Sequence, residues 1–530
     1  MLQTSRSFRG MVCSPHHLAS RAGQRVLEEG GNAIEAMVAA ASTIAVVYPH
    51  MNGLGGDNFW LFREPGNRVF GIDSCGGAAL KADINFYSER GYKQIPTRGP
   101  LSAITCAGAV AGWNEALKVS QKDWGGKMCL SRLLEDAIFY AEDGVAVTKT
   151  QSHNGIQKFS ELKNVPGFCD TFTINGKLPE EGQKFRQERL AKTLRKLCEN
   201  GLDDFYRGEL GRTIAADLYH AGSPLGYEDL ERFKSLRVKP ISLVVEGHKI
   251  YNMPPPTQGL ASLLLLGINN RLNTTEAETF EFIHNLVEST KLAFKVRDTY
   301  VSDPDYMSVN PNAFLQSEKL DKTASMIQNN YAMPWPDLVD RGDTVWLGAI
   351  DNKGRSVSFI QSIYWEFGSG VVLGETGITW QNRGTSFSLN GMHHNSLKPG
   401  RRPFHTIQPA LALLSDGRVM VYGTMGGEGQ PQTQAAIFNR YVVHGQGLQE
   451  AITGPRWLLG KTWGSETSNL RIEHGFEPLI YESLRKVGHD LEVVGRFDEI
   501  MGHAGAIVCH LSGLKEGASD PRSDGVVAAF

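Results

Sequence analysis

Residues 343–350 read Asp343-Thr344-Val345-Trp346-Leu347-Gly348-Ala349-Ile350, and a polar turn separates them from Ser356-Val357-Ser358-Phe359-Ile360-Gln361-Ser362-Ile363. Apolar and β-branched residues on both sides of a short polar turn predict two paired antiparallel strands. The preceding residues, 329–343, are mostly polar, hold two prolines and end in Asp340-Arg341-Gly342-Asp343, which indicates a linker with a terminal turn. A threonine therefore opens a strand directly after a linker.

A threonine in this position has a specific chemical use. Cleavage of the peptide bond before Thr344 would give its hydroxyl a free α-amino group on the same residue. Such an amine, with an ordinary pKa of about 7.7–8.0, can act as the general base for the hydroxyl. β-Branched residues also begin strands for conformational reasons alone, so a plain strand start remains the alternative at this point.

The composition is that of a globular protein. Of the 530 residues, 41% are hydrophobic and 21% charged, and the net charge of −3 with scattered Lys and Arg predicts no nucleic-acid partner. The seven cysteines show no CxxC spacing, which argues against structural zinc and a disulfide framework. The most apolar run, Ala33–Tyr48, contains Glu35 and is short, so a buried helix is expected rather than a membrane span. Without a secretion-type N-terminus, a cytoplasmic enzyme is expected.

Helical and strand patterns occur in blocks along the chain. Helices are expected over most of 107–230, at Gly259–Leu272 and at Glu276–Tyr300, and strands dominate after Thr344. This order predicts an α+β protein of layered sheets and helices rather than a doubly wound sheet. The Gly/Ser/Pro-rich segment Lys515–Asp524 is expected to lie on the surface.

Three glycine-rich loops are candidates for an oxyanion hole. They are Gly53–Asp57, Phe367–Gly370 and Gly423–Gly429. Glycines let backbone N–H groups converge on one oxygen, although each loop taken alone is equally compatible with a tight turn. A phosphate cradle is disfavoured because no Lys-Ser/Thr pair follows any of them.

These pieces, in this order and spacing, resemble the γ-glutamyltranspeptidase family of N-terminal nucleophile hydrolases. The matching segments run nearly end to end: Glu29–Ala36, Gly53–Phe59, Phe205–Gly208, Tyr251–Thr257, Asp343-Thr344, Phe367–Gly370, Gly377–Asn382 and Gly423–Gly427.

The resemblance implies a four-layer αββα sandwich and a proenzyme that cleaves itself between Asp343 and Thr344. The large fragment 1–343 and the small fragment 344–530 would stay together as one intertwined domain, and a dimer of such pairs is left open. Thr344 would be the nucleophile for both cleavage and turnover, and Ser362 would support its amine and hydroxyl. The backbone amides of Gly426 and Gly427 would form the oxyanion hole. The family needs no metal or organic cofactor.

Departures from the family pattern fall in the expected substrate pocket. Cys75 stands where the transpeptidases carry the arginine that holds the substrate α-carboxylate, and a thiol cannot replace a guanidinium. Tyr364 replaces an asparagine, Ser386 an acidic residue, and His405-Thr406 a pair of serines. Almost every group that binds the α-amino and α-carboxylate groups of a glutamyl substrate in the family is thus replaced.

A new cation and bulky neighbours stand in their place. Arg383 lies in the loop that covers the substrate in the family, and Tyr364, Trp365 and Phe367 are bulky, which favours a small pocket for a short acid with one carboxylate. A surface ion pair is the alternative role for Arg383. The Gln381-Asn382-Arg383-Gly384 loop looks like that of the oxamate amidohydrolase branch of purine catabolism, whose substrate gives oxalate and ammonia.

We therefore expect a small-molecule amide as substrate, oxamate first. Three alternatives remain: a glutathione hydrolase or γ-glutamyltransferase with a rebuilt pocket, a hydrolase of longer acyl amides, and a non-catalytic homologue. Candidate substrate-binding residues are Arg383, Tyr364, His405, Thr406 and Ser386.

Overall fold

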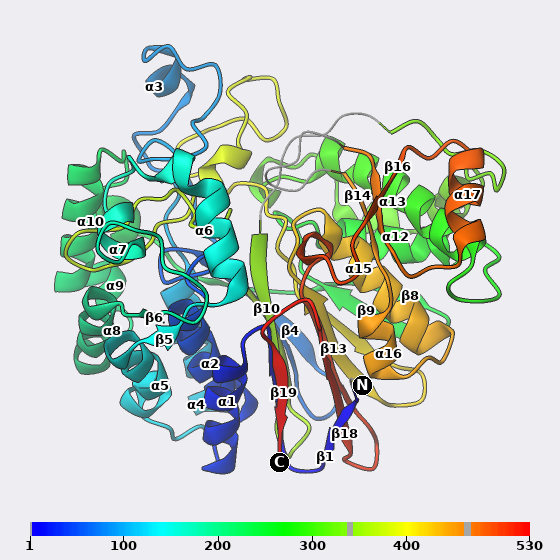
Figure 1. Cartoon of the computed structure of the whole chain (residues 1–530), viewed down its shortest axis with the longest axis horizontal. Coiled ribbons are helices and arrows are strands. Elements are labelled where there is room, and N and C mark those ends of the chain that lie inside the picture. Colours follow the sequence, from blue (N-terminus) through cyan, green and yellow to red (C-terminus); the bar gives the residue numbers. More distant parts are fainter. Residues whose placement is uncertain (1–2, 336–342, 461–467) are drawn as a thin grey trace.

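The computed structural model describes residues 3–335, 343–460 and 468–530. The expected turn at 340–343 lies outside these ranges except for Asp343, the first residue of β10. Within the described ranges, two seven-stranded sheets face each other between layers of helices (Figure 1). The prediction of an αββα sandwich is confirmed.

The first sheet carries Thr344. Its strands, in spatial order, are β19 (Val526–Ala529), β2 (Met11–Ser14), β10 (Asp343–Ile350), β11 (Ser356–Tyr364), β3 (Asp57–Arg63), β4 (Val69–Ser74) and β7 (Leu236–Val238). All the pairings are antiparallel. The expected hairpin of β10 and β11 is therefore confirmed at the centre of this sheet.

The second sheet carries the third glycine-rich loop at the end of one strand. Its order is β1 (Ser5–Ser7), β18 (Lys515–Ser519), β17 (Ala504–Cys509), β13 (Val419–Thr424), β12 (Ala410–Leu413), β9 (His248–Asn252) and β8 (Ile241–Val245). Both sheets mix strands from before and after Thr344.

Helices cover the outer face of each sheet (Figure 1). Beside the first sheet lie α1 (His17–Glu28), α2 (Ala33–Val47), α4 (Ala109–Asp123), α5 (Leu130–Asp143), α8 (Glu188–Asn200) and α10 (Glu209–Ala221). Beside the second lie α12 (Gly259–Asn269), α13 (Phe280–Tyr300), α15 (Gly429–Phe438) and α16 (Leu448–Thr453). Further helices and strands are α3 (Ile84–Ser88), β5 (Val145–Ala146), α6 (Lys149–Leu162), α7 (Phe168–Phe172), β6 (Lys184–Phe185), α9 (Asp204–Arg207), α11 (Tyr227–Glu231), α14 (Ser317–Ala324), β14 (Trp457–Leu459), β15 (Leu470–Glu473), α17 (Pro478–Lys486) and β16 (Leu491–Val494).

Three apolar cores hold the layers together, and each matches one interface. One joins α2 and its neighbours to the first sheet, a second joins α12, α13 and α15 to the second sheet, and a third fills the space between the sheets. Trp346 fills much of that middle space because Gly423 opposite it has no side chain: a Cβ there would lie 2.2 Å from the indole. The buried helix expected at 33–48 is α2, every residue of which is buried.

The surface prediction for Lys515–Asp524 is wrong. Lys515–Ser519 is strand β18, and Lys515 is buried with its ammonium donating to the carbonyls of Phe8 and Gly513. Arg522 is also buried and pairs with Asp520 and Glu473. Polar residues are buried here because each charge has a partner, which composition alone does not reveal.

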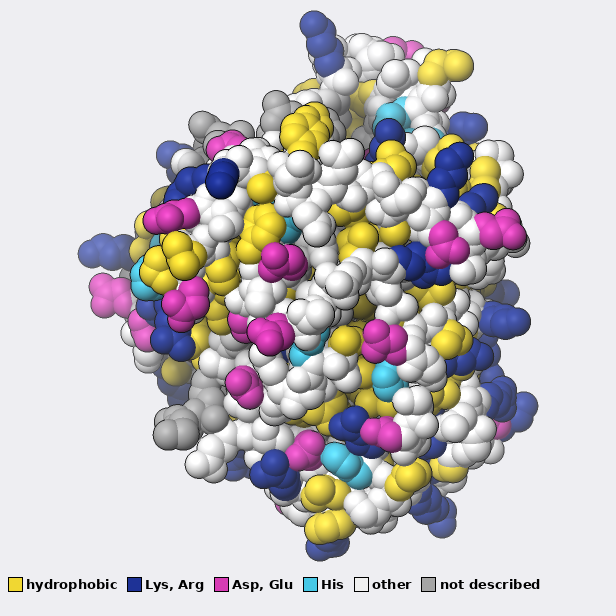
Figure 2. Space-filling view, turned by 90° about the vertical axis from the view of Figure 1, so that its right-hand side faces the viewer, with side chains coloured by type: hydrophobic (Ala, Val, Ile, Leu, Met, Phe, Trp, Pro, Cys, Tyr) yellow, Lys and Arg dark blue, Asp and Glu magenta, His cyan; other side chains and the backbone are white. Residues whose placement is uncertain are grey.

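Acidic and basic side chains both occur across the face that carries α13 and α17 (Figure 2). Among the described residues, no helix has the length and apolar character needed to cross a membrane.

Candidate active site

Thr344 lies on the face of β10 that is turned toward the second sheet. Val345 and Leu347 belong to the helix-side core, whereas Trp346 and Ile350 belong to the core between the sheets. Because successive side chains of a strand point to opposite faces, Thr344 shares the direction of Trp346. Its side chain is fully buried.

Ser362 on β11 is the neighbour of this threonine in the sheet. The register between β10 and β11 shifts between Asp343 and Val345, so Thr344 lies opposite a bulge in β11 that contains Ser362 and Ile363. Bulges re-aim side chains and are frequent next to active sites. The Ser362 hydroxyl accepts a hydrogen bond of 2.8 Å from the backbone N–H of Tyr364, which fixes the orientation of the serine.

The third glycine-rich loop reaches the same place from the other sheet. It connects β13 to α15, and the amide of Gln430 in the first turn of α15 lies 3.5 Å from Thr344 Oγ1. Gly426 and Gly427 have φ values of +108° and +51°, a left-handed backbone region that favours glycine. The loop therefore contains left-handed backbone conformations, which give its amide groups directions that an ordinary connection between a strand and a helix does not provide.

A buried polar network holds this loop in place. Gln258, just before α12, donates to the carbonyls of Gly427 at 2.8 Å and Thr406 at 2.6 Å. Its own amide oxygen accepts a hydrogen bond of 3.0 Å from Arg297 on α13, and the same guanidinium pairs with Glu428 at 2.7 Å. One glutamine thus joins the glycine pair to the segment before β12 that carries Thr406.

Arg383 is buried and is not a surface residue. It is fully buried and donates to the hydroxyls of Ser362 at 3.3 Å and Thr406 at 3.4 Å. Its Nε has no hydrogen-bond partner, and no carboxylate forms an ion pair with it, within the described part of the chain. Burial lowers its pKa to about 10, so the guanidinium stays charged at neutral pH. An enclosed cation with unused hydrogen-bonding capacity suits a small anion.

Tyr364 forms a wall beside this cation. The guanidinium carbon of Arg383 lies 4.0 Å from the centre of the tyrosine ring, a cation–π contact that holds the arginine plane. Tyr364 has a φ of +81°, which is strained for a bulky residue. Such strain persists where surrounding structure enforces it, often at functional sites.

Asp57 and His405 form a buried pair next to Arg383. Their side chains meet at 3.1 Å, and His405 Nδ1 lies 2.8 Å from the carbonyl of Pro403, to which it must donate. Burial holds the pKa of His405 well below its usual value, so the ring is neutral and its Nε2 accepts. The proton between the two side chains therefore resides on Asp57, whose pKa is raised to about 7 by burial, although nearby Arg383 opposes the shift.

The other expected pocket residues have different surroundings. Ser386 is only half-buried and its hydroxyl donates to the carbonyl of Phe404 at 3.2 Å, which closes the loop on itself. Cys75 is buried, and its backbone N–H donates to Asp73. The described residues that could together hold a metal ion, His284, Glu288 and His489, form a separate cluster around Gln328 and Met333.

Sequence reasoning did not assign roles to Gln258, Arg297, Gln430 or Asp57. Asp57 ends the first glycine-rich loop, and Gln430 follows the third, so proximity to these motifs was an available signal. Gln258 immediately precedes the apolar run of α12, where a lone amide is unusual.

Comparison with known proteins identifies the family of the chain. A protein from Klebsiella pneumoniae described as an oxamate amidohydrolase proenzyme is 51% identical over 99% of both chains. A glutathione hydrolase-like proenzyme of Bacillus subtilis is 40% identical over 98% of both. The crystal structure of cephalosporin acylase from Bacillus halodurans superimposes with a TM-score of 0.92 at 33% identity and covers 100% of this chain and 97% of its own. The profile of the Gamma-glutamyltranspeptidase family matches residues 19–530, and the chain belongs to that family.

Proposed function

We propose that this protein is a self-cleaving amidohydrolase that hydrolyses oxamate to oxalate and ammonia, with Thr344 as its nucleophile. The observation that carries the proposal is Arg383, an enclosed cation that contacts Ser362 beside the nucleophile. The similarity to the oxamate amidohydrolase proenzyme of Klebsiella pneumoniae supports the choice of substrate.

Self-cleavage begins with the Thr344 hydroxyl. Its oxygen attacks the carbonyl carbon of Asp343, the peptide C–N bond breaks, and the acyl group moves from nitrogen to oxygen. Water then hydrolyses the ester. This leaves a carboxylate on Asp343 and a free amine on Thr344, the base that turnover requires.

The fragments 1–343 and 344–530 remain associated in this proposal because strand ladders cross between them. β2 pairs with both β10 and β19, β3 pairs with β11, β9 with β12, and β1 with β18. Separation would expose these backbone groups and the apolar cores, which costs far more than cutting one peptide bond releases.

Turnover repeats the same chemistry on the substrate. Arg383 and Thr406 bind the carboxylate of oxamate, which places the adjacent amide carbon near Thr344. The Thr344 hydroxyl passes its proton to the α-amine and attacks, while the amides of Gly426 and Gly427 hold the developing oxyanion. Ammonia leaves with a proton from the amine, and water releases oxalate from the ester.

The decisive test measures ammonia from oxamate with the processed protein. A denaturing gel must show two fragments, and mass spectrometry must place the start of the smaller one at Thr344. We expect ammonia release that is absent from Thr344→Ala. Parallel assays with a γ-glutamyl anilide and a long acyl amide test the two rival hydrolases. A fully processed sample that does not hydrolyse oxamate but cleaves the γ-glutamyl anilide or the long acyl amide would overturn the substrate assignment.

A further inference from the structure

A second cluster of reactive side chains lies apart from the candidate active site. His284 and Glu288 stand one turn apart on α13, and His489 follows α17. One ligand atom from each lies within 4.8 Å of the other two, and all three residues are buried. The hydrolysis derived above uses none of them.

Hydrogen bonding determines which nitrogen of His284 is available. Its Nε2 lies 2.9 Å from the carbonyl oxygen of Gln328, and a carbonyl only accepts, so this nitrogen carries the proton. In the neutral ring the lone pair then lies on Nδ1. That lone pair points at His489 Nε2, 2.9 Å away. A histidine fixed by a backbone carbonyl through its other nitrogen is the usual arrangement of a metal ligand.

Glu288 is oriented in a similar way. Its Oε2 accepts a hydrogen bond of 2.9 Å from the backbone N–H of Met333, which leaves Oε1 on the side of the histidines. Glu288 Oε1 lies 3.9 Å from His489 Nε2. Ligand atoms of a tetrahedral zinc site are about 3.3 Å apart, given bonds of about 2.0–2.1 Å, so small shifts of these side chains reach that geometry.

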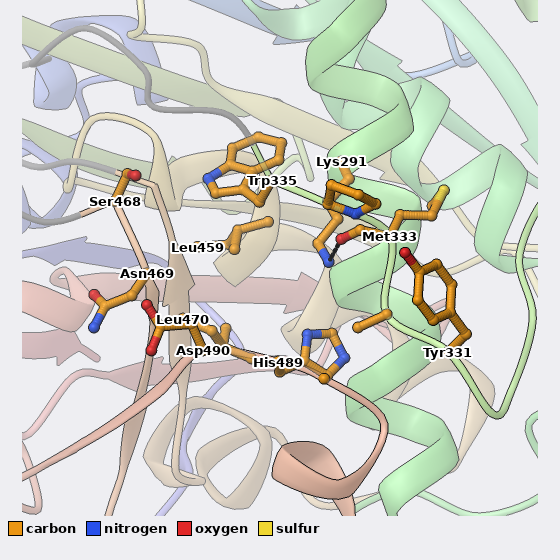
Figure 3. Close-up of a pocket in the computed structure, with 13 residues that line it drawn as sticks. Lys291, Tyr331, Met333, Trp335, Leu459, Ser468, Asn469, Leu470, His489 and Asp490 are labelled. Atoms are coloured by element: carbon orange, nitrogen blue, oxygen red, sulfur yellow. Dashed lines mark hydrogen bonds between the residues drawn. The ribbon is translucent and has the colours of Figure 1, made fainter.

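Lys291 competes for the same carboxylate. Its ammonium lies 2.6 Å from Glu288 Oε1 and donates to the carbonyl of Met333 at 2.6 Å. Lys291 and His489 border one cavity of about 530 Å³, together with Met333 and Trp335 (Figure 3). Because the cavity borders His489, a cation can approach the three side chains through it. The ammonium of Lys291 can move into the same space, and a water molecule can bind there as the fourth ligand.

We propose that His284, Glu288 and His489 bind a zinc ion. Two imidazoles and one carboxylate suit Zn²⁺, whereas Mg²⁺ and Ca²⁺ prefer sites built mainly from oxygen. His284 and Glu288 precede the proposed cleavage site and His489 follows it, so the ion joins the two fragments of the processed protein. This last consequence rests on the proposed cleavage, whereas zinc binding itself does not.

The test is a zinc titration of the full-length protein by equilibrium dialysis, with its thiols blocked because seven cysteines would compete for the metal. We expect one equivalent of zinc to bind. His489→Ala should weaken binding at least about 100-fold, since changing even a residue that only orients a ligand costs 10–100-fold. His510→Ala is the matched control, because that partly exposed histidine also contacts a glutamate, Glu516 at 3.1 Å, and its loss should change nothing.

Lys291→Met separates a metal site from a purely structural cluster. It removes the competing ammonium, so zinc should bind at least about tenfold more tightly, equivalent to about 1.4 kcal/mol. If the cluster only supports the fold, this variant loses stability and gains no affinity. Absence of zinc binding by the thiol-blocked wild type, or binding that neither His489→Ala nor Lys291→Met alters, would overturn the proposal.

Discussion

Replacement of Arg383 tests the pocket most directly. In Arg383→Gln the side chain stays polar but loses its charge, and the hydroxyls of Ser362 and Thr406 lose a donor. A hydrogen bond to a charged group contributes about 1.5–3 kcal/mol, so two such bonds to the substrate carboxylate amount to about 3–6 kcal/mol. We expect kcat/KM for oxamate to fall about 10²–10⁴-fold.

The assay compares oxamate with oxamide, in which a second amide replaces the carboxylate. Oxamide cannot form the charged contact, so Arg383→Gln should leave its hydrolysis nearly unchanged. Arg383→Lys keeps a charge but loses the planar fork, and we expect an intermediate loss on oxamate of about 10–100-fold. Arg440→Gln removes another fully buried arginine, paired with Glu278, and controls for general destabilisation.

Equal losses on both substrates would refute the reasoning. Arg383 would then act through folding or through the orientation of Ser362, and the carboxylate would bind elsewhere. The state of self-cleavage must be checked for each variant, because an unprocessed sample would imitate the same result.

Three further predictions concern the nucleophile, its support and the buried acid. Thr344→Ala should remain one chain on a denaturing gel and release no ammonia, and a processed Thr344→Ala protein would contradict the cleavage chemistry. Gln258→Leu leaves the carbonyls of Gly427 and Thr406 without their hydrogen-bond donor, and each unsatisfied buried carbonyl costs about 1–3 kcal/mol. We expect kcat to fall by a larger factor than KM rises. An unchanged kcat would show that Gln258 does not position the glycine loop. Asp57→Asn should alter the pH dependence of unfolding. From pH 3.8 to about 7 the folded wild type holds a proton on Asp57 that the unfolded chain releases. In denaturant titrations the stability of the wild type relative to the variant should therefore fall as the pH rises and level off above about 7. Parallel curves for the two proteins would contradict the raised pKa of Asp57.

Local patterns predicted the elements around Thr344 well. The alternation after Thr344 and the short polar turn identified β10 and β11, and the uniformly apolar run identified α2. These signals depend on neighbours in sequence. The pairing of β10 with β2, more than three hundred residues earlier, carries no local signal and required the structure.

Candidate site residues could be named from the sequence only where they stand in a motif. Thr344, Ser362 and the glycine pair stand in segments with family-like order, and the exchange at Cys75 could be read by position. The network of Gln258 and Arg297 could not, because its members are ordinary helical or loop residues until folding brings them under the glycine loop.

The position of Thr344 within β10 is compatible with the proposed role of this residue as a nucleophile. β2 pairs with β10 only over Gly348–Ile350, so the first half of the strand has β11 as its neighbour on one side. In the proposed cleavage the antiparallel partners would keep the strand in place, because the ladder beyond Val345 does not depend on the peptide bond before Thr344. Because side chains alternate along a strand, the Thr344 side chain points toward the second sheet, where the loop between β13 and α15 lies opposite it. The proposed nucleophile thus lies in a part of the strand that pairs with β11 alone, opposite a glycine-rich loop.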